Sequence, residues 1–224
     1  MKILYVILLI PILFTNSTWA ANHSNKQPTL DLKSQLNLAK GLELEGKIKE
    51  SLFAIEKISQ NHDNNEQIAL PLGRLYVKNG HINKAIKTLE PFTLEHSNDW
   101  KPWFWLGSAF LLNQDYVNAG LNIDEALARE GNNSAIWVQK ALIEQARGNN
   151  QSAINILEVA NNIAPNNADV LLNLAYANEL TGNNLKAQQL YRTFLYLSSK
   201  LKRYSRLRAE IVYRLSSFTR QTKL

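Results

Sequence analysis

The sequence predicts an all-helical protein built from stacked helical hairpins, and three regularities lead to this fold class. Small residues recur every 34 residues, at Ala39, Gly73, Gly107, Ala141 and Ala175 and again at Ser51, Ala85, Ala119, Ala153 and Ala187. Apolar residues around each of these positions follow the i, i+3, i+4, i+7 spacing of one helix face. A glycine separates the two apolar stripes at Gly46, Gly80, Gly148 and Gly182, where it favours the end of a helix.

The composition excludes several classes of function. The chain has 224 residues, of which 45% are hydrophobic, so it can bury a core. It lacks cysteine, which excludes disulfides, thiolate metal sites and a cysteine nucleophile. The four histidines are widely spaced. We therefore expect no metal, no cofactor and no enzymatic activity.

The first twenty residues resemble an export signal. A basic start at Met1-Lys2 precedes an apolar run from Ile3 to Phe14, and small residues end the segment at Ala20. The run is shorter than the roughly 20 residues that cross a bilayer, which favours a cleaved secretory signal over an uncleaved anchor. Residues 21–31 are then expected to form a flexible leader, and the protein to be exported, with a bacterial periplasm as the favoured location.

Five copies of the 34-residue unit follow, each predicted to be two antiparallel helices. Their predicted bounds are 32–65, 66–99, 100–133, 134–167 and 168–201. The asparagines that follow two of the turn glycines, Asn149 and Asn183 among them, are expected to cap the second helices. Pro71 lies inside the first helix of the second copy, so that helix either begins late or is kinked.

The chain continues after the fifth copy with a further helical stripe. Its apolar residues are Leu201, Tyr204, Leu207, Ile211, Leu215 and Phe218. This spacing predicts a helix that begins an incomplete sixth copy and closes the core, since repeat arrays need a terminal capping element. Residues 202–224 are therefore expected to form a basic capping helix and tail.

The repeat residues resemble the tetratricopeptide repeat (TPR) family over about residues 32–201. The third copy shows its Trp-x2-Leu-Gly-x2-aromatic run as Trp103, Leu106, Gly107 and Phe110; the fourth shows Trp137, Ala141, Ala153, Ala160 and Pro165; the fifth shows Leu174, Ala175, Gly182, Ala187 and Tyr191. The resemblance implies a right-handed α-α superhelix, a TPR solenoid of five hairpins plus the capping helix. It also implies a role in binding other proteins rather than in catalysis.

In this family the face of each first helix that points away from the core lines a concave groove where peptides bind. By register, the candidate groove residues are Lys33, Asn37, Lys40, Arg74, Lys78, Lys101, Trp105, Ser108, Gln139, Asn173 and Tyr176. The first three copies place five basic residues and no acid on this face, whereas the last two copies are nearly uncharged. This asymmetry favours an acidic or carboxylate-bearing protein or peptide. Trp105 has an alternative role, in which it packs against the helix that contains Pro71.

The C-terminal segment is strongly basic. Its candidate contact residues are Lys200, Lys202, Arg203, Arg206, Arg208 and Arg214, and Glu210 is the one acidic residue among residues 199–224. The charges predict either the solvated face of a capping helix or a contact with an anionic membrane surface or an acidic partner. The export signal argues against nucleic acid as the partner.

The sequence therefore predicts an exported protein-interaction scaffold or assembly factor. The alternative is an accessory protein of polysaccharide synthesis or export, in which Trp105 and Tyr176 stack on sugars. A third possibility, an enzyme, is disfavoured because Asp169 is the one carboxylate on the mapped groove face.

Overall fold

The computed structural model describes residues 30–62 and 65–221, and the predicted export signal and most of the leader lie outside them. The described residues from Leu32 onward belong to one compact unit. Its helices are α1 (Leu32–Leu44), α2 (Ile48–Gln60), α3 (Glu66–Lys78), α4 (Ile82–Glu95), α5 (Trp100–Leu112), α6 (Tyr116–Arg129), α7 (Ser134–Ala146), α8 (Asn150–Ile163), α9 (Ala168–Leu180), α10 (Asn184–Ser198), a 3₁₀ turn η1 (Lys202–Tyr204) and α11 (Ser205–Gln221). No strand occurs in the described ranges. The predicted all-α fold class is confirmed.

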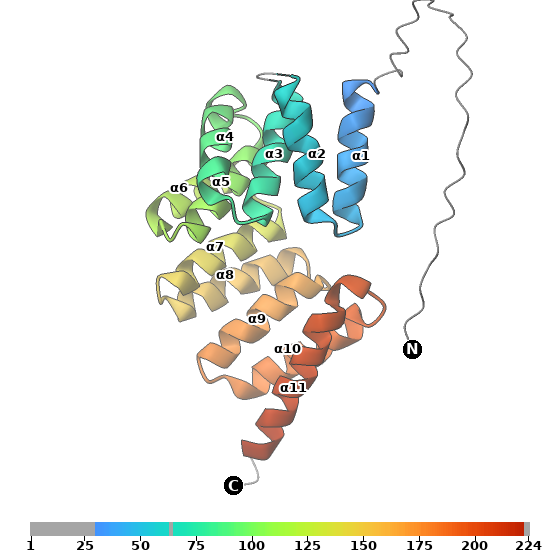
Figure 1. Cartoon of the computed structure of the whole chain (residues 1–224). Coiled ribbons are helices and arrows are strands. Elements are labelled where there is room, and N and C mark those ends of the chain that lie inside the picture. The colour runs from blue at the N-terminus through green and yellow to red at the C-terminus, as the bar shows by residue number, and fades with distance from the viewer. Residues whose placement is uncertain (1–29, 63–64, 222–224) are drawn as a thin grey trace, which may run out of the picture. The chain divides into compact units, whose positions relative to one another are not determined.

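Consecutive helices pair into hairpins, and each hairpin packs against the next one along the chain (Figure 1). The turns inside the hairpins depend on a left-handed residue. Gly80 has a φ of 76°, and Gln114 adopts a φ of 61° at the equivalent turn of the third copy, where glycine is missing. Gln114 is the one non-glycine residue with a positive φ in the described part of the chain.

The small residues that recur every 34 residues lie where the two helices of a hairpin approach most closely. A Cβ atom on Gly107 would lie 2.9 Å from the Ile123 side chain and 3.2 Å from the carbonyl oxygen of Ala119. In the first copy, Ser51 replaces alanine, and its buried hydroxyl donates a hydrogen bond of 2.8 Å to the carbonyl oxygen of Ala39. A small side chain is therefore required on both helices.

The prediction that asparagines cap the second helices is wrong. Asn149 and Asn183 stand at the starts of α8 and α10 but make no side-chain cap hydrogen bond. Their ψ angles, 58° and 55°, differ from the extended ψ of 114° at Asn167, whose side chain caps α9. Side-chain caps occur at the first helices, for example at Asn65 of α3, and at one second helix, α6, where the Asp115 carboxylate accepts from the backbone N–H of Asn118. After the left-handed Gly148 and Gly182, the backbone at Asn149 and Asn183 directs the side chain away from the helix start.

The structure also settles where two helices begin, α3 and α11. Pro71 lies inside α3, which begins at Glu66, so the helix does not start late. The terminal helix α11 begins at Ser205 and not at Leu201, because η1 intervenes. The α11 segment still closes the core, since Ile211 is 0% exposed.

Candidate partner-binding groove

The structure brings three of the predicted groove residues together at one small pocket between α1 and α3. Asn37 and Lys40 come from α1 and Arg74 from α3, and the pocket has a volume of about 120 Å³. Pro71 and Glu43 also line it. Pro71 lacks a backbone donor, so it adds an apolar wall without a polar group to satisfy.

Glu43 is the residue of this site that the register argument missed. Its carboxylate accepts hydrogen bonds from Arg74 Nη1 at 2.7 Å and from Lys78 Nζ at 2.6 Å. The Glu43 side chain is only 8% exposed, so the two cations share one buried carboxylate. Together with Lys40, for which no ion pair is present among the described residues, these groups carry a net charge of +2.

Trp105 is half-buried beside this cluster. Its indole packs against the core formed by copies one and two, with Phe104 at 5.2 Å between ring centroids. Lys78 Nζ lies 5.7 Å from the indole centroid. This packing corresponds to the alternative role foreseen for Trp105, and its ring is no free stacking platform for a sugar.

The other groove candidates of the first three copies divide into exposed and buried groups. Lys33 is exposed, and Lys101 is exposed with its Nζ 3.7 Å from Asp99. Ser108 is 6% exposed, and its hydroxyl donates to the carbonyl oxygen of Phe104 at 2.8 Å. Ser108 is therefore an internal residue and does not present its hydroxyl to a ligand.

In the last two copies, Asn173 and Tyr176 are engaged with their own chain. Asn173 donates to the carbonyl oxygen of Asp169 at 2.8 Å, and Gln139 is half-buried. The Tyr176 ring lies edge-on to Tyr191 with 5.6 Å between centroids, and burial raises the pKa of the Tyr176 phenol. The Asn173 and Tyr176 side chains are therefore engaged within the chain, in contrast to the exposed Lys40.

A second cluster of carboxylates explains why the Tyr176 ring is packed within the chain. Glu179 pairs with Arg214 at 3.2 Å and accepts a hydrogen bond from the Tyr191 hydroxyl. Burial, and then the hydrogen bond to Glu179, raise the pKa of Tyr191. Arg214 also pairs with Glu210 at 3.0 Å and lies 5.1 Å from the Tyr176 centroid. The prediction of a nearly uncharged C-terminal groove missed these acids.

Some of the basic residues in the C-terminal segment make contacts within the chain. Arg208 donates to the carbonyl oxygens of Ser198 and Leu201 at 2.6 and 2.8 Å, which ties α11 to the segment that follows α10. Arg203 lies 3.8 Å from Asp169, whose carboxylate also accepts from the Tyr204 hydroxyl at 2.7 Å. The remaining predicted contact residues, Lys200, Lys202 and Arg206, are exposed.

Asp169 is the carboxylate on which an enzymatic function of the groove would depend. It accepts a hydrogen bond from the Tyr204 hydroxyl. Across residues 30–62 and 65–221 no group of three or more histidine or acidic side chains is placed to hold a metal ion. None of the helices in the same ranges is long and apolar enough to cross a bilayer.

Comparison with known proteins places the fold. Residues 70–136 match the tetratricopeptide repeat family model. A thermophilic TPR protein of Thermus thermophilus superposes with a TM-score of 0.72 at 16% identity, over 83% of this chain and 97% of that one. MamA superposes with a TM-score of 0.58 at 21% identity, over 79% and 99%. MamA of Desulfovibrio magneticus RS-1 gives 0.59 at 14% identity, over 76% and 96%. No curated protein matches the sequence.

Proposed function

We propose that this chain, whose residues 70–136 match the tetratricopeptide repeat model and whose fold is that of TPR proteins, is a scaffold for protein–protein interaction. We further propose that it binds an acidic segment of a partner protein. The binding site is the groove face of α1 and α3, around Lys40 and Arg74. The observation that carries the proposal is the pocket of about 120 Å³ lined by both cations.

The charge balance around the pocket supports an anionic ligand. Glu43 neutralises only one of its two partners, Arg74 and Lys78, and holds both side chains in place. A carboxylate of the ligand would meet an Arg74 side chain that Glu43 already holds in place, which lowers the cost of binding, and would pair in addition with the exposed Lys40. Because Lys40 is exposed, this attraction mainly governs association rate and salt dependence.

The chain is proposed to act outside the cytoplasm, as an assembly factor in a bacterial envelope. This part rests on the basic start and the apolar run from Ile3 to Phe14 in the sequence. The polysaccharide alternative depended on Trp105 and Tyr176 as stacking surfaces, and no contact of either ring favours it. Among the described side chains of the tail, a membrane contact would rest mainly on the exposed Lys200, Lys202 and Arg206.

The test is fluorescence anisotropy with a labelled glutamate-rich peptide and a neutral glycine-serine peptide of equal length. Lys40→Glu is expected to weaken binding of the acidic peptide about tenfold, which corresponds to about 1.4 kcal/mol. Lys57→Glu is the matched control, because Lys57 is an exposed lysine of α2 that does not line the pocket. Equal binding of the acidic peptide by wild type and Lys40→Glu would contradict the proposal.

A further inference from the structure

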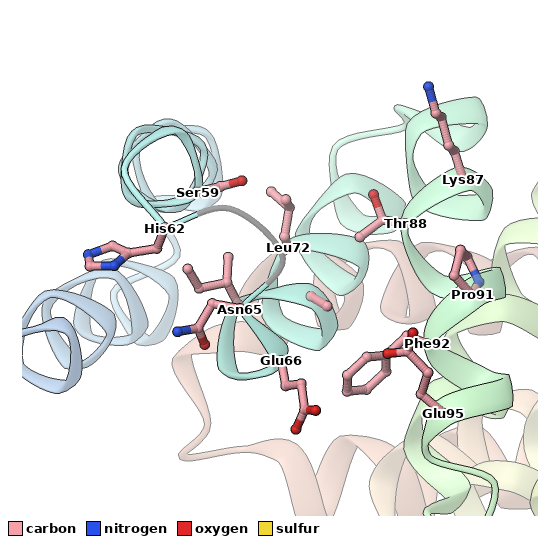
Figure 2. Close-up of a pocket in the computed structure, with 12 residues that line it drawn as sticks. Ser59, His62, Asn65, Glu66, Leu72, Lys87, Thr88, Pro91, Phe92 and Glu95 are labelled. Atoms are coloured by element: carbon pink, nitrogen blue, oxygen red, sulfur yellow. The ribbon is translucent and has the colours of Figure 1, made fainter.

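A second pocket lies apart from the groove, between the end of α2, the start of α3 and the side of α4 (Figure 2). Its volume is about 500 Å³. Ile68, Leu72 and Phe92 form an apolar floor, and these three side chains are only 3%, 8% and 8% exposed. In Figure 2 the Phe92 ring projects from α4 toward α3 across this floor.

The pocket exists because the second copy has a small residue where the later copies have a large one. Ala69 stands at the fourth position of its copy, and the residues at this position in the next three copies are Trp103, Trp137 and Leu171. Ala69 lines the pocket. The side chain that fills this space elsewhere in the array is therefore missing here.

The facing position on the second helix does not compensate for the loss. The copies with tryptophan have alanine opposite it, at Ala126 and Ala160, whereas the second copy has Phe92. The fifth copy has the same phenylalanine, at Phe194, but combines it with Leu171, and both of its residues are buried. The second copy combines phenylalanine with alanine and so leaves the space between the helices open.

The rim of the pocket is acidic. Glu66 and Glu95 line it, and the Glu66 side chain is 70% exposed, with its Oε2 atom 3.7 Å from Nε2 of His96. No ion pair of Glu95 is present among the described side chains. Lys87 also lines the pocket, but in Figure 2 its ammonium group extends away from the Phe92 ring.

The third copy indicates what would complete this site. There the Arg129 guanidinium lies 4.7 Å from the centroid of the Trp103 ring, and Arg129 occupies the position that corresponds to Glu95. The second copy thus lacks the aromatic ring and has a carboxylate in place of the cation. A ligand that supplies both a ring and a cation would rebuild the pair that the third copy makes within its own chain.

We propose that this pocket docks an aromatic side chain of a partner protein, in a segment whose neighbouring residue is basic. The ring would enter beside Ala69 and contact the edges of Ile68, Leu72 and Phe92 that remain open to the pocket. The adjacent cation would pair with Glu66 and Glu95. The site is independent of the groove, and it has the opposite charge preference.

The test uses two blocked tripeptides that contain 5-fluorotryptophan, Lys-Trp-Lys and Glu-Trp-Glu, observed by fluorine NMR so that the protein's own tryptophans stay silent. Wild type is expected to shift and broaden the Lys-Trp-Lys signal and to bind Glu-Trp-Glu at least fivefold more weakly. Ala69→Leu copies the Leu171–Phe194 arrangement of the fifth copy, and it is expected to reduce Lys-Trp-Lys affinity at least tenfold. Ala128→Leu, at an exposed alanine of α6, is the matched control and should bind as wild type does.

Glu95→Arg provides a second variant that changes only the rim. It is expected to reverse the preference between the two peptides, whether or not Ala69→Leu folds. Lys40→Glu should leave Lys-Trp-Lys binding unchanged, which separates this site from the proposed groove function. Equal Lys-Trp-Lys binding by wild type, Ala69→Leu and Glu95→Arg, or no binding by wild type, would overturn the proposal.

Discussion

Two charge clusters occupy the same four repeat positions at opposite ends of the array, 136 residues apart, and they differ in sign. The first cluster consists of Lys40, Glu43, Arg74 and Lys78; the second consists of Tyr176, Glu179, Glu210 and Arg214. The first has a net charge of +2 and the second has a net charge of −1. In both, a glutamate at the twelfth position pairs with a cation at the thirteenth position of the next copy.

The two clusters show that the same backbone arrangement can carry side chains with different roles. In the N-terminal cluster a surplus of cations faces a pocket, where we propose that an anionic ligand binds. In the C-terminal cluster Arg214 is shared by Glu179 and Glu210 and lies over the Tyr176 ring, so the contacts are used to hold α11. Equivalent positions in a repeat therefore do not imply equivalent function.

The largest expected effect concerns packing at the two ends. Leu38 and Leu174 are at the same repeat position, but Leu38 is 61% exposed and Leu174 is 0% exposed, because no hairpin precedes the first copy among the described residues. We expect Leu174→Ala to cost about 2–5 kcal/mol of unfolding free energy. Leu38→Ala should cost less than about 0.5 kcal/mol. Urea denaturation measures the unfolding free energy of both variants. Equal losses would contradict the expected difference in packing between the two ends.

The next effect concerns the ion pair between Glu179 and Arg214, which attaches α11 to α9. Glu179→Gln removes the charge that pairs with Arg214, and the Glu179 side chain is 26% exposed. We expect a loss of about 1–3 kcal/mol, because Arg214 loses one of its two carboxylate partners and the buried Tyr191 hydroxyl loses its charged acceptor. Hydrogen exchange should become faster in α11 while binding of the acidic peptide stays unchanged. Unaltered exchange in α11 would show that Glu179 does not hold this helix.

Glu43→Gln should have a smaller effect, and it should appear in binding. The substitution keeps the shape of the side chain but releases Arg74 and Lys78 from their shared negative charge. We expect affinity for the acidic peptide to rise about fivefold, or about 1 kcal/mol, with a modest loss of stability. Weaker binding by Glu43→Gln would mean that ordering of the cations matters more than their surplus charge.

The smallest effect is a dependence on alkaline pH at the C-terminal cap. Burial, and then the hydrogen bond to Asp169, raise the pKa of Tyr204 to about 12. Since the folded protein favours the neutral phenol, this stabilisation is complete below about pH 10 and is lost as the pH rises toward about 12. Ultraviolet titration of tyrosinate should show a late component that Tyr204→Phe reduces by one tyrosine, because Tyr76, Tyr176 and Tyr191 also have raised pKa values. In Asp169→Asn the late component should shift to lower pH, and an unshifted titration would exclude that hydrogen bond.

The sequence was sufficient for the fold because its period is physically constrained. Close helix contacts demand small residues, as Gly107 against Ile123 illustrates, so a repeat of small residues predicts the hairpins directly. The cap at Asn149 was predicted wrongly because its ψ of 58° does not bring the side chain to the helix start, whereas Asp115 at the equivalent position of the third copy has a ψ of 79° and caps α6.

The binding face was less predictable, since a helical register gives the direction of a side chain but not its partners. Glu43 is one residue outside the set of positions mapped to the groove, and its ion pairs reach residues 31 and 35 positions away. Ser108 is on the predicted face but is covered by neighbouring helices. Comparison of the twelfth position across copies would have found both Glu43 and Glu179.

The most direct test of the contrast between the two ends is hydrogen exchange of the protein with and without the glutamate-rich peptide. The account predicts slower exchange in α1 and α3, no change in α9 and α11, and loss of the protection in Lys40→Glu but not in Lys57→Glu. Protection centred on α9 and α11, or protection that persists in Lys40→Glu, would contradict it.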